Sequence, residues 1–104
     1  MAYAAPGKRI YLLTTNAWWW QRLTGFLDMK SEVLNWFMVF GANTVLLVSR
    51  ADVHALTNVI HEGLPDIWFI LAEIDPRKTN GWVNQQVWDF LNNPKSSGRW
   101  EPTD

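Results

Sequence analysis

Cysteine is absent from the 104-residue sequence. Without it the chain can form no disulfide, no thiolate nucleophile and no cysteine-ligated zinc site, so the simplest compartment is a reducing one and we expect a cytoplasmic protein. Charge is also scarce, with 9 Lys and Arg against 10 Asp and Glu. Proteins that bind nucleic acid gain affinity largely from a basic excess that neutralises phosphates. This balance therefore disfavours a nucleic-acid partner.

Long apolar runs and catalytic motifs are missing as well. The uncharged apolar stretch at residues 33–48 is interrupted by Asn35, Gly41 and Asn43, and it is shorter than the roughly 20 apolar residues that a membrane-spanning helix needs. No membrane partner is expected. The sequence has no phosphate-binding loop, GxSxG elbow, dinucleotide fingerprint or metalloprotease helix motif. It therefore predicts no cofactor, no metal site and no catalytic residue, and favours a non-catalytic role.

Apolar runs of strand character alternate with segments of helical periodicity along the chain. We expect residues 1–8 to be a flexible lead-in, residues 9–91 to form a single α+β domain, and residues 92–104 to be a polar tail. Within the domain, strands are predicted at 10–15, 33–40, 44–49 and 66–75, and helices at 17–28, 51–63 and 82–91. Asn16 is the expected N-cap of the first helix. Residues 41–43 are the expected turn of a hairpin between the second and third strands.

The order of these elements resembles the ferredoxin-like βαββαβ pattern over residues 9–75, with one helix added at the C-terminal side. Many small ligand-binding, nuclease-like and antitoxin proteins share that fold, and the fold alone does not specify a function. The alternative is a helix over residues 31–40, which would end at Gly41 and leave a three-strand α/β sandwich. Such a helix would be apolar nearly all round and hard to bury in a small domain, so the hairpin is favoured.

The predicted sheet has two apolar faces. Side chains alternate between faces along a strand, yet in the last strand Phe69 and Leu71 on one side are matched by Trp68 and Ile70 on the other. In a plain ferredoxin-like domain two helices cover one face, and the other face meets water and should be polar. The second face must therefore be covered by the C-terminal helix, by a second subunit or by a ligand.

Tryptophan is the most unusual feature of the composition, with 8 residues in the chain. Three consecutive tryptophans on a helix spread over about 200°, so one buried face cannot hold them all. Exposed tryptophan is enriched at protein interfaces. The candidate binding residues are Trp18, Trp19, Trp20, Trp68, Trp82 and Trp88.

Two functional hypotheses remain. The first is a small interaction protein that binds another protein or a second copy of itself. The second is a ligand-binding or weakly enzymatic domain with a pocket between the sheet and the C-terminal helix, lined by Trp68, Trp82 and Trp88.

Other polar residues that could carry chemistry have simpler interpretations. His54 and His61 lie two turns apart on one helix, about 10 Å, which is too far to share a metal ion. We expect both to be solvated. Glu73 and Asp75 at the end of the last strand are expected to form local ion pairs with the basic residues that follow, such as Arg77.

Overall fold

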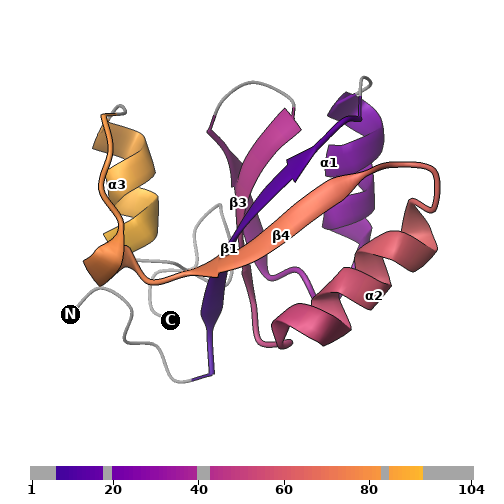
Figure 1. Ribbon diagram of the computed structural model, residues 1–104, viewed down its shortest axis with the longest axis horizontal. Helices are drawn as coiled ribbons and strands as arrows, with labels where there is room; N and C mark the ends of the chain where they lie inside the picture. The colour runs from indigo at the N-terminus through magenta and orange to yellow at the C-terminus, as the bar shows by residue number, and fades with distance from the viewer. Residues whose placement is uncertain (1–6, 18–19, 40–42, 83–84, 93–104) are drawn as a thin grey trace.

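The computed structural model describes residues 7–17, 20–39, 43–82 and 85–92. Strands and helices follow one another along the part of the chain that the structure describes (Figure 1). In order they are β1 (Arg9–Thr15), α1 (Trp20–Met29), β2 (Asn35–Met38), β3 (Thr44–Ser49), α2 (Val53–Gly63), β4 (Phe69–Ile74), η2 (Pro76–Lys78) and α3 (Gln85–Asn92). The protein is an α+β structure, as the sequence predicts.

The strands form one antiparallel sheet in the order β2-β3-β1-β4. β2 and β3 pair from Asn35↔Val48 to Met38↔Val45, so the predicted pairing of these two strands is confirmed and the helical alternative for residues 31–40 is wrong. The predicted turn falls partly on residues 40–42, which lie outside the described residues. This segment is a strand because its neighbouring aromatic residues pack on opposite faces of the sheet: Trp36 on one face and Phe37 on the other.

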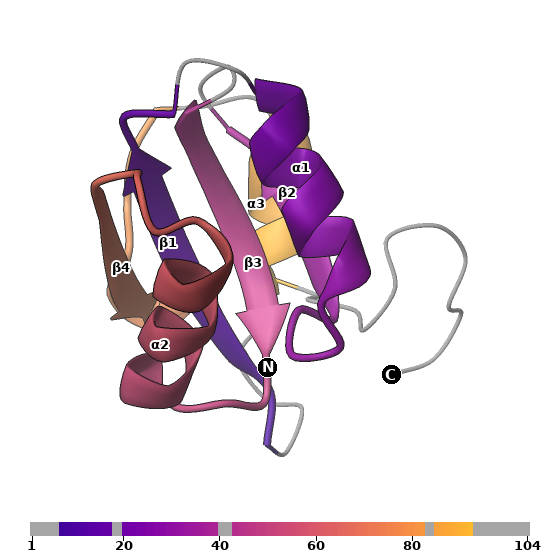
Figure 2. The same cartoon turned by 90° about the vertical axis from the view of Figure 1, so that its right-hand side faces the viewer.

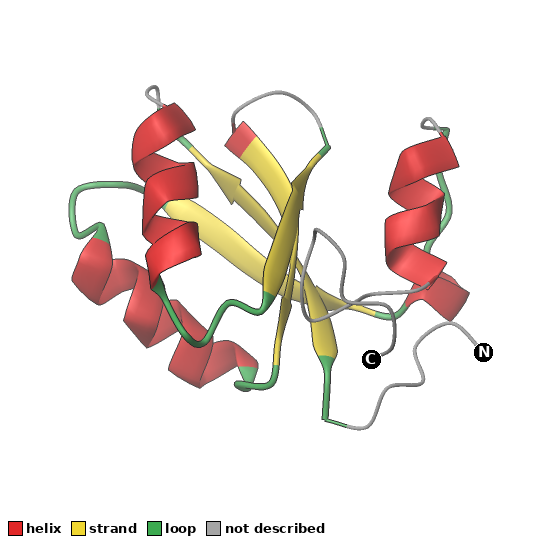
Figure 3. Cartoon of the chain, turned by 180° about the vertical axis from the view of Figure 1, so that it is seen from behind, coloured by secondary structure: helices red, strands yellow, loops and turns green. Residues whose placement is uncertain are grey.

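The helices lie on two sides of the sheet. Figures 1 and 2 show α1 and α2 on one face, and Figure 3 shows α3 standing alone on the opposite face. α2 starts at an N-cap, where the Asp52 carboxylate accepts a hydrogen bond from the Ala55 N–H at 2.8 Å. Arg22 of α1 forms a two-pronged ion pair with Asp66, just before β4.

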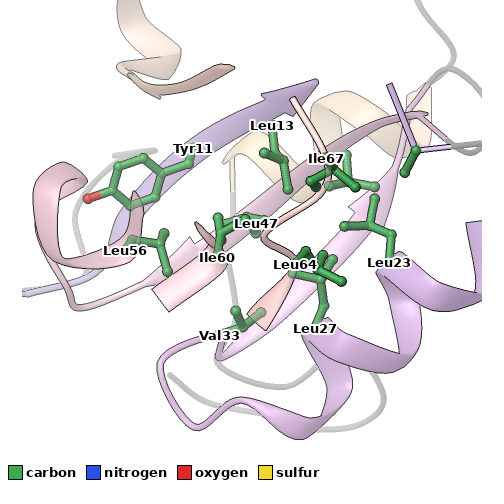
Figure 4. Packing of buried hydrophobic residues seen from close by; sticks show 12 residues of the cluster. Tyr11, Leu13, Leu23, Leu27, Val33, Leu47, Leu56, Ile60, Leu64 and Ile67 are labelled. Atoms are coloured by element: carbon green, nitrogen blue, oxygen red, sulfur yellow. The ribbon is translucent and has the colours of Figure 1, made fainter. Parts of the chain in front are cut away.

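The first core cluster lies between the sheet and the α1–α2 layer (Figure 4). Leu13 and Leu47 from the central strands meet Leu23 of α1 and Ile60 of α2, and all four are fully buried. The buried Tyr11 also belongs to this cluster, and its hydroxyl donates a 2.6 Å hydrogen bond to the Ala51 carbonyl oxygen. A buried hydroxyl thus has a partner, as burial of a polar group requires.

A second core cluster occupies the other face, under α3. Ile10 and Leu46 of the sheet pack with Val87 and Leu91 of α3, and the Phe37 and Phe90 rings stack with centroids 5.5 Å apart. The prediction that both faces of the sheet are apolar is confirmed. Of the three covers that the sequence leaves open for the second face, the structure places the C-terminal helix over part of it.

Several predicted boundaries move. β4 is shorter than the predicted strand at 66–75, and α3 begins at Gln85 where the sequence predicts a helix from residue 82. Trp82 lies before α3, and residues 83–84 are outside the described part of the chain. Among the described residues, no helix combines the length and the apolar character needed to cross a membrane.

Candidate functional site

The tryptophan run at the start of the first helix is only partly within the described structure. Trp18 and Trp19 lie outside the described residues. Trp20 is the first residue of α1, and its backbone position is all that the structure describes of it. The predicted role of this run as a binding surface stays a prediction.

Trp68 lies directly before β4, where two hydrogen bonds with Asn16 hold its backbone, and its side chain points into solvent. Its backbone N–H donates to the Asn16 side-chain oxygen at 2.8 Å, and the Asn16 N–H donates to the Trp68 carbonyl oxygen at 3.1 Å. The expected N-cap role of Asn16 is therefore replaced by a bridge that continues the β1–β4 pairing by one residue. The Trp68 side chain is 81% exposed. A large apolar side chain on a fixed backbone loses little freedom when it binds a partner.

Ile70 extends this exposed apolar surface along the strand. It lies two residues after Trp68 on the same face of the sheet and is 68% exposed. Its neighbour across the sheet is Thr14, whose hydroxyl lies 3.3 Å from that of Thr44. Trp68, Ile70 and the exposed Ala72 form what we call the β4 surface. β4 is an edge strand that pairs with β1 alone among the described strands, so this surface borders an open edge of the sheet.

A pocket of about 260 Å³ lies on the same face but at its other end, between the sheet and α3. Its sheet side is formed by Leu12, Leu46 and Ile74, and its helix side by Val87, Trp88 and Leu91. Residues 79–82, which lead from η2 toward α3, form part of its rim. We call this the α3 pocket.

Of the three tryptophans expected beside a pocket between the sheet and the C-terminal helix, the structure places two at the α3 pocket. Trp82 and Trp88 line the α3 pocket, whereas Trp68 does not. The reason is that Trp68 precedes β4 and the pocket lies at the opposite end of that strand, beside Ile74. Trp88 is half-buried in the second core cluster, while the side chain of Trp82 is fully exposed.

The charged residues near the end of β4 form local pairs. Arg77 binds the Asp75 carboxylate through two side-chain hydrogen bonds of 3.0 and 2.9 Å and holds the pKa of Asp75 below its usual value. Glu73 pairs with Arg9 across the sheet at 3.4 Å. The expected pairing with a basic residue that follows the strand is confirmed for Asp75, whereas Glu73 pairs with Arg9 of β1.

The histidines are where the sequence places them, on an exposed flank of α2. Both His54 and His61 are exposed. Within the described part of the chain, no group of three or more histidine, aspartate or glutamate side chains is placed so that it could hold a metal ion.

Sequence reasoning missed Asn16, Ile70 and Leu12 as site residues. Asn16 looks like a helix cap because the same side-chain oxygen that caps a helix can accept from a strand N–H. Ile70 and Leu12 are both apolar residues of alternating strands, so the sequence does not distinguish them. The extent of α3 leaves Ile70 exposed to solvent and makes Leu12 part of the pocket lining.

Comparison of the chain with protein-family models, with curated proteins and with solved structures gives no match. The site must therefore be interpreted from its own chemistry.

Proposed function

We propose that this chain is a small non-catalytic interaction protein that forms a homodimer by pairing the β4 strands of two copies. The observation that carries the proposal is the β4 surface, where Trp68 and Ile70 are 81% and 68% exposed beside an open sheet edge. An apolar edge strand is a template for pairing with another strand, and natural proteins usually protect such edges with charge, proline or a covering element. Edge pairing followed by apolar contact is a common mode of protein recognition.

We also propose a ferredoxin-like architecture with an added C-terminal helix. Support comes from the strand order β4-β1-β3-β2, which is the observed order counted from the other edge, and from the position of α1 and α2 on one face. The cytoplasm is the proposed location, since a chain without cysteine gains nothing from an oxidising compartment.

The sequence of β4 is compatible with antiparallel self-pairing centred on Ile70. In that register Ile70 faces Ile70 of the second copy, and Trp68 faces Ala72 of the second copy, so that each large indole is placed over a small side chain. Directly opposed residues of an antiparallel pair lie about 4.5–5.5 Å apart, close enough for these side chains to pack. All three residues are exposed in the single chain and would be covered together.

The charge pattern of β4 is compatible with the same arrangement. Glu73 is the single charged residue of β4, and its position in this register faces the apolar Ile67 of the second copy, so no like charges oppose each other.

The proposal is tested by measuring molar mass with size-exclusion chromatography and light scattering over a range of concentrations. We expect the natural chain to be dimeric and Ile70→Lys to be monomeric, because two ammonium groups would face each other across the two-fold axis. Mixing Ile70→Lys with Ile70→Glu should restore a dimer, since the opposed charges then attract. This rescue is specific to a register in which position 70 faces itself.

The matched control is Met29→Lys, which places the same charge on another exposed apolar position, at the end of α1. This variant should remain dimeric. Circular dichroism should show the native spectrum for all variants, because the substituted side chains are exposed. A monomeric natural chain at 0.5 mM, or failure of the Lys and Glu variants to associate when mixed, would overturn the proposal.

A further inference from the structure

We propose that the α3 pocket binds a small neutral molecule with two fused aromatic rings and one polar substituent. This site is separate from the β4 surface and does not depend on dimer formation. It is composed of side chains from the sheet and from α3 that meet on the second face. Ligand sites of this kind are concave and mostly apolar, with a few polar groups that fix orientation.

The lining of the pocket sets the charge of its ligand. Among the described residues that line the pocket none carries a formal charge, and the sheet side includes the aliphatic side chains of Leu12, Leu46 and Ile74. A charged ligand would lose its hydration there without gaining a counter-charge, which is strongly unfavourable. The site therefore favours a neutral, apolar molecule.

The size of the pocket sets the size of the ligand. Its volume is about 260 Å³, while an apolar cavity of about 150 Å³ is large enough to hold benzene. A two-ring aromatic molecule is the next size that this volume accommodates. The half-buried Trp88 supplies an aromatic surface against which such a ring system can pack.

The polar rim gives the orientation. The Asn80 side-chain oxygen accepts a 2.8 Å hydrogen bond from the Gly81 N–H, which fixes the side chain beside the pocket. The amide nitrogen of Asn80 can donate a hydrogen bond to a hydroxyl or carbonyl oxygen on the ligand. Trp82 follows on the same rim, and its fully exposed indole is placed to cover a bound ring.

The test uses 2-naphthol as the probe and 2-naphthoate as its charged counterpart, with binding followed by two-dimensional ¹H–¹⁵N NMR. We expect saturable shifts around Leu12, Leu46 and Val87, with a Kd of the order of 100 µM for a ligand of this size. Binding of 2-naphthoate should be at least about tenfold weaker because its carboxylate must be desolvated. Equal affinity for the two probes, or shifts confined to residues outside the pocket, would overturn the proposal.

Two variants, each with a matched control, test the location of the binding site. Leu12→Trp fills the pocket from the sheet side and should abolish 2-naphthol binding, whereas Met38→Trp adds the same bulk on the opposite face and should leave it unchanged. Trp82→Ala should weaken binding at least about threefold, and the matched Trp68→Ala should not. If Leu12→Trp, folded by circular dichroism, binds like the natural chain, the assignment is wrong.

The outcome is separable from that of the proposed dimer. Ile70→Lys lies outside the pocket, so a monomer made by this substitution should bind 2-naphthol with unchanged affinity. Loss of binding in that monomer would show that the pocket depends on the second copy, which contradicts the present assignment.

Discussion

Substitution of Tyr11 by phenylalanine should change stability in opposite directions at neutral and at alkaline pH. Tyr11 is fully buried beneath α2, and its hydroxyl donates a 2.6 Å hydrogen bond to the Ala51 carbonyl oxygen. Burial, reinforced by the negative charge of Glu73, raises the pKa of Tyr11 to about 12 from its ordinary value of 10.0. Phenylalanine keeps the ring and removes both the donor and the titrating group.

At pH 7 Tyr11→Phe should lower the free energy of unfolding by about 1 kcal/mol, because one net hydrogen bond is lost. At higher pH the sign reverses. The unfolded chain releases the phenolic proton near pH 10, whereas the folded chain holds it to about pH 12. The protonated hydroxyl therefore contributes its full stabilisation below pH 10, and this stabilisation is lost as the pH rises to 12. The loss lowers the free energy of unfolding of the natural protein by about 2–3 kcal/mol and does not affect the variant, which lacks the hydroxyl.

Urea denaturation followed by far-ultraviolet circular dichroism at pH 7.0, 10.0, 11.0 and 11.5 measures this difference. The free energies of unfolding of the two proteins should become equal near pH 11, and the variant should be the more stable by about 1 kcal/mol at pH 11.5. Other groups that titrate in this range are common to both proteins, so their effects cancel in the difference. A difference that stays constant from pH 7 to pH 11.5 would refute the assigned burial and hydrogen bond of Tyr11.

Three further substitutions test the packing by thermal and urea denaturation. Gly63→Ala should destabilise the protein by about 1–3 kcal/mol, because a Cβ atom there would overlap the ring of Phe26. Gly25→Ala, inside α1 with no atom within 4 Å of the added Cβ, should instead stabilise it by about 0.5–1 kcal/mol; the same sign for both would contradict this packing. Phe90→Ala removes the ring stacked on Phe37 and should cost at least about 1 kcal/mol, so an unchanged midpoint would argue against the docking of α3.

Much of the fold could be predicted because its strands are buried on both sides. In β3, Val45 and Leu47 serve the first core cluster while Leu46 serves the second, and all three are buried. A run of consecutive apolar residues is what such a strand requires, and a solvated strand would show polar residues at alternate positions. The existence of a covering element over the second face followed from this pattern.

The exposed part of the second face could not be predicted, because it depends on the length and placement of α3. This helix has 8 residues and is about 12 Å long, whereas the six-residue β4 extends about 20 Å. α3 reaches Ile74 at one end of β4 and leaves Ile70 and Trp68 uncovered at the other. In sequence these three residues follow the same alternation, so periodicity cannot distinguish the buried position from the exposed ones.

The role of α3 as the cover of the second face gives a final prediction, made by comparing chains that end at different residues. A chain of residues 1–80 lacks α3. Ile10 and Leu46 are buried in the 104-residue chain, and without α3 they would be exposed to water together with Phe37. Exposure of an apolar surface of this size leads to association. We expect this chain to aggregate. A chain of residues 1–92 keeps α3, and we expect it to remain soluble in the same oligomeric state as the 104-residue chain. If the 1–80 chain is instead a soluble monomer, α3 does not protect the second face, and the α3 pocket loses its helix side. If it is a soluble dimer, a second copy covers that face, and the β4 edge is not the interface.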